Sequence, residues 1–203
     1  VVHGVNRPGQ GTLILSCASC TTNNIAPVME IMQRHFGVEK ALMTTLHAYT
    51  ATQMLVDSPG GKKDMRRGRA AAANFVPSST GAAVAAAKAL PELVGKFDGL
   101  AVRGPVAVGS LADITLLTSR NTTPEEINDI FRKEAVSERY RDILGVAEDE
   151  LVSSDIIKDP RASIVQLDLT RVVDGNLVKV MTWYDNEWGY TNQMIKTALH
   201  TLG

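Results

Sequence analysis

Two spacings of apolar residues divide the first part of this chain into predicted elements. The run TLILS at 12–16 is short and apolar, which is typical of a strand. Apolar residues then recur every three or four positions from 22 to 36, and Gly37 follows them, so a helix with a glycine cap is predicted. Residues 38–50 alternate between apolar and polar types, which predicts a strand with His47 near its end.

The second part of the chain also divides into short elements. Residues 76–93 predict a turn that opens an alanine-rich helix, and residues 99–120 predict two strands. The stretch 121–135 carries a capping box and predicts a helix. A β-hairpin is expected around the Asp-Gly pair at 174–175, because a tight turn there needs a positive φ, and 191–202 has the pattern of an amphipathic helix.

This order of elements predicts a mixed sheet with helices packed on it, in the α+β or the α/β class. A dinucleotide-binding fingerprint of the form G-x-G-x-x-G would follow a strand. The glycines of GQGT at 9–12 instead precede the apolar run. A nucleotide-binding half is therefore not expected within these residues.

Composition excludes several classes of function. With 203 residues, 44% of them hydrophobic, the chain can bury a core as one large domain or two small ones. Lys plus Arg total 21 and Asp plus Glu total 22, so no net field attracts nucleic acid or an anionic membrane. The basic loop at 57–69 lacks interleaved aromatic residues, which also argues against nucleic acid. No apolar run approaches the roughly 18 residues of a membrane span, and no signal peptide is visible, so the cytoplasm is the expected compartment.

Two cysteines at the turn before the first predicted helix allow several interpretations. As metal ligands, Cys17 and Cys20 would supply only two positions, and the four histidines lack the close pairs of zinc motifs. As a C-x-x-C pair they would form a thiol–disulfide site. As a single nucleophile, Cys20 would have its thiolate stabilised by the helix N-terminus, with Cys17 buried and inert. Both would otherwise be small core residues.

Five blocks of sequence favour the single nucleophile. They are ASCTTN at 18–23, TTLHAYTATQ at 44–53, SSTGAA at 78–83, GLAVR at 99–103 and WYDNEWGY at 183–190. In this order and at these spacings they resemble the catalytic domain of the phosphorylating glyceraldehyde-3-phosphate dehydrogenase family, in which a dinucleotide-binding domain precedes the cysteine block. The resemblance covers nearly the whole chain.

The resemblance implies an α+β fold with a mixed, largely antiparallel sheet and helices packed on one face. Residues 1–203 would be the catalytic domain, and the final helix, at about 187–203, would dock on the dinucleotide-binding domain that this chain does not contain. The start at VVHGVN, without a methionine, agrees with a piece whose N-terminal part is missing. The full-length protein would be a homotetramer, as in the family.

The resemblance also assigns the chemistry. The family's nucleophile falls on Cys20 and its base on His47, which would form a thiolate–imidazolium pair. A thiolate adds to the aldehyde carbon of glyceraldehyde 3-phosphate, hydride leaves for NAD or NADP, and inorganic phosphate takes up the thioester. Cysteine suits both halves of this reaction, because it is nucleophilic near neutral pH and its thioester still transfers the acyl group. The reaction is a step of glycolysis.

The remaining site residues come from the same resemblance. The substrate phosphate would be held by Thr50 and Arg103, and Arg66 would lie near the phosphates, although its match is ambiguous with Arg67. The nicotinamide would meet Asn186 and Tyr190, and no metal is expected. The incoming phosphate would be bound at two helix starts by four residues: Ser19, Thr21, Thr80 and Gly81.

Three alternatives remain open at this level. One is a dehydrogenase of a longer aldose phosphate, such as erythrose 4-phosphate. Another is a thiol–disulfide protein that uses Cys17 and Cys20, and the third is a non-catalytic fragment. The chain also departs from the family's common S-N-A-S-C-T-T-N-C pattern, because it has Cys17 and Asn24 at two of these positions. We expect the isolated chain to be inactive in hydride transfer, since the domain that presents the nicotinamide is absent.

Overall fold

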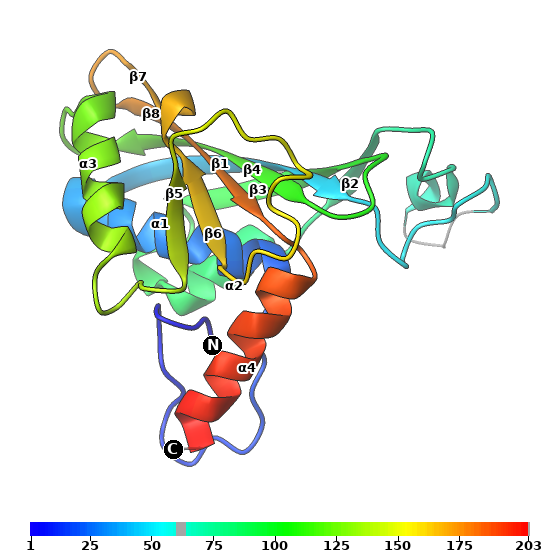
Figure 1. Ribbon diagram of the computed structural model, residues 1–203, viewed down its shortest axis with the longest axis horizontal. Helices are drawn as coiled ribbons and strands as arrows, with labels where there is room; N and C mark the ends of the chain where they lie inside the picture. The colour runs from blue at the N-terminus through cyan, green and yellow to red at the C-terminus, as the bar shows by residue number, and fades with distance from the viewer. Residues whose placement is uncertain (60–63, 203) are drawn as a thin grey trace.

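A computed structural model describes residues 1–59 and 64–202 of the protein (Figure 1). Helices and strands alternate along the chain, with the longest helix at the start of the sequence of elements. The helices are α1 (Cys20–Phe36), α2 (Ala82–Ala89), α3 (Pro124–Ala135) and α4 (Trp188–Leu202). The strands are β1 (Val38–Ala48), β2 (Val76–Ser79), β3 (Phe97–Gly104), β4 (Ser110–Thr118), β5 (Leu144–Ala147), β6 (Ser163–Gln166), β7 (Arg171–Val173) and β8 (Leu177–Tyr184).

The strands form one eight-stranded sheet in the order β2-β3-β1-β4-β8-β6-β5, with β7 paired to β8. Only the pairs β1–β3 and β5–β6 are parallel, and the other pairs run antiparallel. The parallel pair β1–β3 places His47 opposite Arg103. The expectation of an α+β fold with a mixed, largely antiparallel sheet is confirmed.

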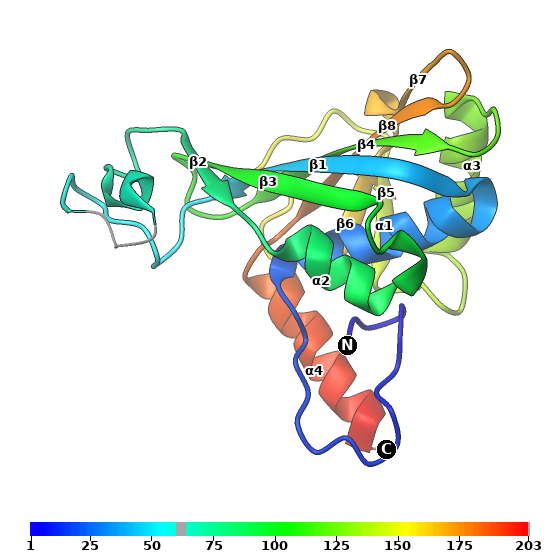
Figure 2. The same ribbon diagram turned by 180° about the vertical axis from the view of Figure 1, so that it is seen from behind.

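Alternation along β1 decides which face of the sheet is buried. Ala41, Met43, Thr45 and His47 are buried, as the sequence predicted, because successive side chains point to opposite faces. Helices α1 and α2 lie side by side under this face (Figure 2). The apolar side chains of α1 are almost completely buried there, as expected for a helix that fills the centre of a core.

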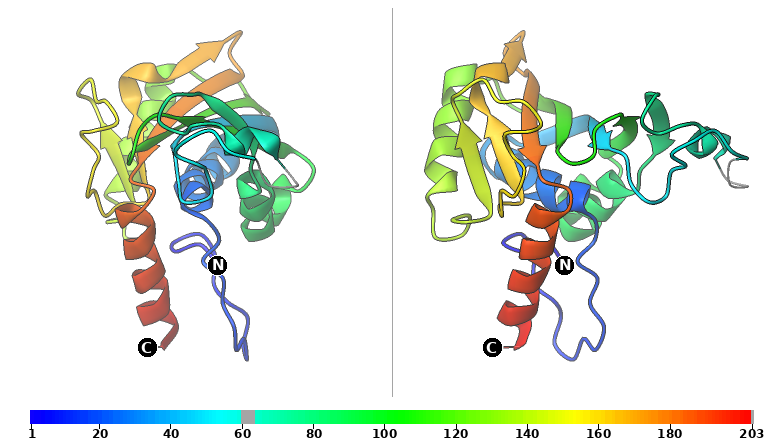
Figure 3. Two further views of the ribbon diagram at one scale, coloured as in Figure 1. Left: turned by 90° about the vertical axis from the view of Figure 1, so that its right-hand side faces the viewer. Right: turned by 45° about the vertical axis from the view of Figure 1, so that its right-hand side comes forward.

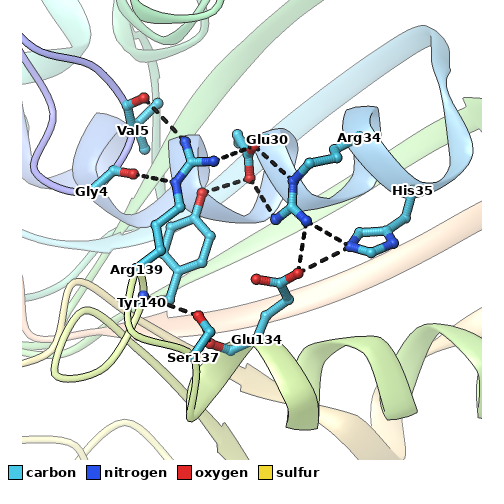
Figure 4. A network of polar contacts seen from close by, with 9 residues as sticks. All are labelled: Gly4, Val5, Glu30, Arg34, His35, Glu134, Ser137, Arg139 and Tyr140. Carbon is cyan, nitrogen blue, oxygen red and sulfur yellow. Dashed lines mark hydrogen bonds and ion pairs between the residues drawn. The ribbon is translucent and has the colours of Figure 1, made fainter.

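The half of α1 farthest from Cys20 carries a network of charged side chains (Figure 4). Glu30 accepts hydrogen bonds from Arg34 (3.0 Å), Arg139 (2.8 Å) and the hydroxyl of Tyr140 (2.6 Å). Burial by itself would raise the pKa of Glu30, but the bonds from Arg34 and Tyr140 and the charge of Arg139 hold it below its ordinary value.

The same network joins segments that are far apart in the sequence. Arg34 also donates to Glu134 of α3 (2.9 Å). Arg139 donates to the carbonyl oxygens of Gly4 (2.7 Å) and Val5 (3.2 Å), which fastens the N-terminal segment to the body. Every cation here therefore faces a carboxylate or a carbonyl oxygen.

Helix α4 extends away from the sheet, and the N-terminal segment runs beside it (Figures 1 and 3). The segment 12–16 forms no strand, and Leu13 and Ile14 are 96% and 89% exposed. The strand expected there is a wrong prediction. A strand needs a neighbour for its backbone groups, and the described part of the chain offers none at this place.

Other predictions were correct in type but missed short elements. The helices at 22–36 and 121–135 and the hairpin at 174–175 are present, and α1 begins two residues earlier, at Cys20. Residues 76–79, expected as a turn, form β2 on the edge of the sheet, and β5 had no counterpart among the predicted elements. In the basic loop predicted at 57–69, positions 60–63 lie outside the described residues.

Candidate active site

Cys20 is the first residue of α1, and the turn before it is held by local hydrogen bonds. Ser19 is the N-cap, with extended backbone, and its hydroxyl accepts from the Thr22 N–H (3.1 Å). Ala18 has φ 57°, a left-handed conformation that is uncommon outside glycine. The side-chain amide of Asn23 donates to the carbonyl oxygens of Cys17 (2.8 Å) and Ser19 (2.9 Å). These bonds fix the Cys20 sulfur at the positive end of the helix.

His47, near the end of β1, lies directly beside this sulfur. Its Nε2 is 3.4 Å from Cys20 Sγ, which is hydrogen-bond distance for a sulfur pair. His47 is buried, and the ring of Tyr184 meets it edge to face with centroids 5.8 Å apart. The two residues that the sequence proposed as nucleophile and base are therefore brought together.

The electrostatics of the pair favour its neutral form. Burial raises the pKa of the Cys20 thiol, and the hydroxyl of Thr21 and the charge of Arg103 offset this only in part. Burial and then the Arg103 charge lower the pKa of His47 to about 4, against the carbonyl of Ala48, which favours the charged ring. Both directions favour a thiol beside a neutral imidazole. The thiolate–imidazolium pair expected from the sequence is disfavoured by burial, because forming it places two charges where the neutral pair has none.

Arg103, at the end of β3, reaches the other side of the His47 ring. Its Nη1 lies 2.6 Å from His47 Nδ1 and 3.1 Å from the Ala48 carbonyl oxygen. The same oxygen is 2.7 Å from Nδ1. Burial lowers the pKa of Arg103, and no carboxylate in the described part of the chain offsets it. The guanidinium remains charged, since arginine does not lose its proton in proteins.

The starts of α1 and α2 meet on one side of Cys20. Thr22 links them, because its hydroxyl bonds to that of Ser19 (2.8 Å) and to the Ala82 carbonyl oxygen (3.4 Å). Thr80 accepts from the Ala82 N–H (3.2 Å), and Gly81 is the N-cap of α2 without a side-chain cap of its own. Two helix N-termini with free N–H groups therefore lie near each other, a good arrangement for an oxyanion.

The other residues expected to bind phosphate do not gather at one place. Thr21 is buried, and its hydroxyl is 2.9 Å from that of Tyr184. Thr50 follows β1 and bonds to the hydroxyl of Thr52 (3.0 Å). Arg66 is turned to Asp64 (3.1 Å), and its side chain is 60% exposed. The structure does not bring Arg66 to Cys20.

Arg67, the neighbour with which Arg66 could be confused, is the arginine directed toward the sheet. It donates to Ser78 of β2 (2.9 Å), and its charge acts on Arg103. The two arginines stand close enough to repel each other, and an anion between them would relieve this. Sequence alone left Arg66 and Arg67 indistinguishable because they are adjacent in one loop.

Asn186 and Tyr190 flank the site from the end of β8 and the start of α4. The amide oxygen of Asn186 accepts from Gly109 N–H (3.1 Å) and the Ser110 hydroxyl (3.2 Å), so the direction of its side chain is fixed. Tyr190 donates to the carbonyl oxygen of Ala18 (3.4 Å), in the turn that carries Cys20. An oriented amide and an aromatic ring bonded to the turn before Cys20 are groups that suit the nicotinamide end of a dinucleotide.

Tyr184 is a site residue that the sequence motifs did not predict. Its hydroxyl lies 2.9 Å from that of Thr21 and 2.8 Å from that of Thr45, and the ring packs beneath both Cys20 and His47. Burial raises the pKa of Tyr184, so the phenol stays protonated. The available signal was the alternation in β8, which places residues 182 and 184 on one buried face.

Cys17 and Cys20 are both free and half-buried. Cys17 lies outside the helix, beyond the left-handed Ala18. Within residues 1–59 and 64–202, no group of three or more His, Cys, Asp or Glu side chains could hold a metal ion. None of the helices described is both long enough and apolar enough to cross a membrane.

Comparison with known proteins gives a consistent result. The family described as glyceraldehyde 3-phosphate dehydrogenase, C-terminal domain, matches residues 19–186. The glyceraldehyde-3-phosphate dehydrogenase of Streptomyces coelicolor is 46% identical over 198 residues, covering 96% of this chain and 58% of the relative. The Mycobacterium bovis protein of the same name is 49% identical over 197 residues (96% and 57%), and that of Haloarcula vallismortis is 46% identical over 199 (98% and 58%). The chain thus spans less than two thirds of the length of these relatives.

Proposed function

Because this chain belongs to the family of the glyceraldehyde 3-phosphate dehydrogenase C-terminal domain, we propose that it is the catalytic part of a phosphorylating dehydrogenase. The proposed reaction oxidises glyceraldehyde 3-phosphate and couples the oxidation to phosphate uptake, giving 1,3-bisphosphoglycerate. The observation that carries this proposal is the 3.4 Å contact between Cys20 Sγ and His47 Nε2 at the start of α1. A nucleophile and a base within reach of each other are the minimum for covalent acyl chemistry.

The first step follows from the neutral state of the pair. His47 Nε2 removes the thiol proton as the Cys20 sulfur adds to the aldehyde carbon, so no buried thiolate needs to exist beforehand. His47 then passes this proton to the aldehyde oxygen, which becomes the hydroxyl of a hemithioacetal, and the ring is neutral again. Free N–H groups at the start of α1 stabilise negative charge that develops on this oxygen during the addition.

In the second stage the hemithioacetal is oxidised to the thioester of Cys20. A bound nicotinamide supplies the acceptor for the hydride. His47 takes the hydroxyl proton as the carbonyl group forms. Asn186 and Tyr190 hold the nicotinamide ring in place and shield the reacting atoms from water. Inorganic phosphate then attacks the thioester carbon, forms the acyl phosphate and releases Cys20.

Two anion sites are needed for these reaction steps. The substrate phosphate is assigned to Arg103 and Thr50, and Arg67 joins them in place of Arg66 because it is the arginine that lies toward β2. The attacking phosphate is assigned to the meeting starts of α1 and α2. Ser19, Thr21, Thr80 and Gly81 are its proposed ligands, and the bond from the Thr22 hydroxyl to the Ala82 carbonyl oxygen, which joins the two helix starts, supports this assignment.

The cofactor is NAD or NADP, bound mainly by a dinucleotide-binding domain that precedes these residues in the full-length protein. That domain is proposed to cover α4 and the segment 12–16. Trp188, Ile195 and Leu199 of α4 are 52%, 51% and 67% exposed, and Leu13 and Ile14 are more exposed still. Exposed apolar side chains on both neighbouring segments favour a partner surface at this place.

The assembly and compartment are further parts of the proposal. Leu42, Leu46 and Leu100 are exposed on the face of the sheet opposite α1 and α2. We assign this face to contact with a second copy in a homotetramer. Two free cysteines suit the reducing cytoplasm.

A two-part assay tests the proposal. The chain 1–203 is expected to hydrolyse an activated ester through an acyl-Cys20 intermediate, and to produce no measurable NADH from glyceraldehyde 3-phosphate, phosphate and NAD. Fusion to the dinucleotide-binding domain of the Streptomyces coelicolor relative is expected to restore NADH production.

Matched variants and substrates separate the alternatives. Cys20→Ser is expected to abolish both activities, and Cys17→Ser to retain them. Equal losses in both variants would favour the thiol–disulfide function. A fused protein that oxidises erythrose 4-phosphate but not glyceraldehyde 3-phosphate would replace the proposed substrate, and a fused protein inactive on both would favour the non-catalytic fragment.

A further inference from the structure

One amino group of Arg103 touches two acceptors that belong to the His47 position. Nη1 lies 2.6 Å from Nδ1 of the ring and 3.1 Å from the Ala48 carbonyl oxygen. An Nη1 amino group has two hydrogens, so it can donate to both. The guanidinium has no lone pair, and the contact to Nδ1 is favourable only when Nδ1 carries no proton.

Two neighbours of Nδ1 make opposite demands on it: Arg103 Nη1 requires a bare nitrogen, and the Ala48 carbonyl oxygen requires a protonated one. When Nδ1 accepts from Arg103, the proton of the neutral ring sits on Nε2 and points at Cys20 Sγ, 3.4 Å away. A protonated Nε2 can donate to the sulfur but cannot take the thiol proton. The ring is then a hydrogen-bond donor and not a base.

A second arrangement is available without moving the ring. The Ala48 carbonyl oxygen is 2.7 Å from Nδ1, an ordinary distance for a bond donated by Nδ1–H. If Arg103 leaves, Nδ1 can carry the proton and donate to this oxygen. The lone pair of Nε2 then faces Cys20, as a general base requires.

The surroundings of His47 contain no competing charge. Cys20 faces the ring from α1, Arg103 from β3 and Tyr184 from β8, and β4 reaches only the Ala48 N–H, through the Ser110 hydroxyl (3.2 Å). No carboxylate is among these groups in the described part of the chain. Arg103 is therefore the neighbour that can select the proton's position.

An anion near the site would attract the Arg103 guanidinium away from His47. It is partly buried, no carboxylate pairs with it, and the charge of Arg67 repels it. A phosphate oxyanion accepts two parallel bonds from a guanidinium and would neutralise both arginines. Such an oxyanion is a stronger partner for the guanidinium than the neutral ring of His47.

We propose that Arg103 is a positioning residue that holds His47 in its non-basic tautomer until a phosphate-type oxyanion draws the guanidinium away. The ring stays neutral in the exchange: Nε2 gives its proton to solvent, and Nδ1 takes one from solvent. A phosphorylated substrate thereby prepares the base for its own oxidation, whereas an uncharged aldehyde meets an unprepared site. The low pKa of His47, to which the Arg103 charge contributes, agrees with this arrangement.

The direct test is nitrogen NMR of the unmodified chain 1–203 with ¹⁵N-labelled histidine, titrated with sulfate at pH 7. Imidazole ¹⁵N shifts distinguish the two tautomers. The Nε2–H form is expected without sulfate and the Nδ1–H form at saturation, with sodium chloride of equal ionic strength as the control. A ring that is Nδ1–H from the start, or that ignores sulfate, would overturn the proposal.

The rate at which Cys20 is alkylated provides a kinetic test of the same change of tautomer. Sulfate is expected to speed alkylation of Cys20 by iodoacetamide about tenfold, a part of what general-base catalysis usually contributes. Arg103→Met is expected to react fast with or without sulfate. Arg69→Met removes an exposed arginine that pairs with Asp57, and it is expected to respond like the parent chain.

The outcomes separate this inference from the proposed function on which it rests. Neither measurement needs cofactor or turnover, so a fused enzyme may be inactive while the tautomer still responds. Sulfate acceleration that persists in Arg103→Met would exclude Arg103 as the cause. If Arg103→Met does not fold, the NMR titration of the parent chain decides alone.

Discussion

The two ends of α1 treat charge in opposite ways. At the far end, Glu30, Arg34 and Arg139 satisfy one another, and each cation has an acidic partner within 3.2 Å. At the Cys20 end, Arg103 is partly buried against the ring of His47 and has no carboxylate partner among the described residues. Both ends lie on one helix, yet only one of them is electrostatically complete.

This difference separates a structural site from a chemical one. Paired charges fix segments relative to each other, as Arg139 fixes the N-terminal segment. An unpaired buried cation costs free energy and is tolerated where a ligand completes it. The incomplete end is therefore where binding energy is available for catalysis.

The largest effect expected at the incomplete end is on turnover alone. Cys20→Ser should lower ester hydrolysis by at least about 10³-fold, because hydroxyl is a far weaker nucleophile at neutral pH. The free energy of unfolding should change by less than about 1 kcal/mol, since the half-buried sulfur is replaced by a similar volume. Stopped-flow assays and urea unfolding measure the two quantities. A large loss of stability would make Cys20 part of the structural end.

The second largest effect is expected in the pH dependence of the free energy of unfolding, which should differ between the two ends of α1. The pKa of His47 is about 4 in the folded chain and 6.5 as the ordinary value. Between these values the unfolded chain binds more protons, so stability is lost as pH falls, by up to about 3 kcal/mol. His47→Asn should remove this slope in urea unfolding between pH 7 and 4.

Glu30 should affect the free energy of unfolding in a lower pH range than His47. Its pKa is lowered from 4.5, so its contribution is present above that value and is lost as pH falls through the folded pKa. The slope removed by His47→Asn should therefore lie above the one removed at Glu30. Coincident windows would contradict the assignment of separate ends.

Breaking the complete end should destabilise the chain without touching chemistry. Glu30→Gln leaves Arg34 and Arg139 without their shared carboxylate and should cost about 2–3 kcal/mol, less than a fully buried pair because both arginines are about 40% exposed. The rate of ester hydrolysis per folded molecule should stay unchanged. Glu39→Gln, at an exposed position of β1, is the matched control in the same denaturation experiment.

The middle of α1 should show the smallest effect. Asn24 is fully buried; its oxygen accepts from Thr182 (3.0 Å), and its Nδ2 has no hydrogen-bond partner among the described residues. Asn24→Cys removes one hydrogen bond and one unsatisfied donor, so the free energy of unfolding should change by no more than about 1 kcal/mol. Calorimetry would detect a larger change, which would indicate that a water completes this amide.

The sequence predicted the parts of the fold that repeat a local pattern. Helix α1, strand β1 and the turn at 174–175 follow from spacing and turn chemistry. The edge strand β2 did not, because its four residues look like a turn until β3 is beside them. The run 12–16 has the pattern of a strand and lacks a neighbour, which no local rule can reveal.

The same limit applies to the site. Cys20 and His47 were identified by their motifs, and their contact is confirmed. The roles of Tyr184 and Arg67 depend on contacts between distant segments, and the neutral state of the pair depends on burial. Such quantities arise from packing and are not encoded in spacing.

The register of the parallel pair β1–β3 has a consequence for how this protein can diverge. His47 and Arg103 are direct partners across the two strands, so their relation is set by the sheet and not by the chain that connects them. Insertions or deletions between β1 and β2 can change the connecting segment while leaving the spacing of His47 and Arg103 untouched. A single-residue slip of either strand would turn its own member of the pair to the opposite face and separate the two side chains. Descendants of this sequence can therefore explore new ligands in the loop at little cost, whereas the paired strands tolerate almost no change in length.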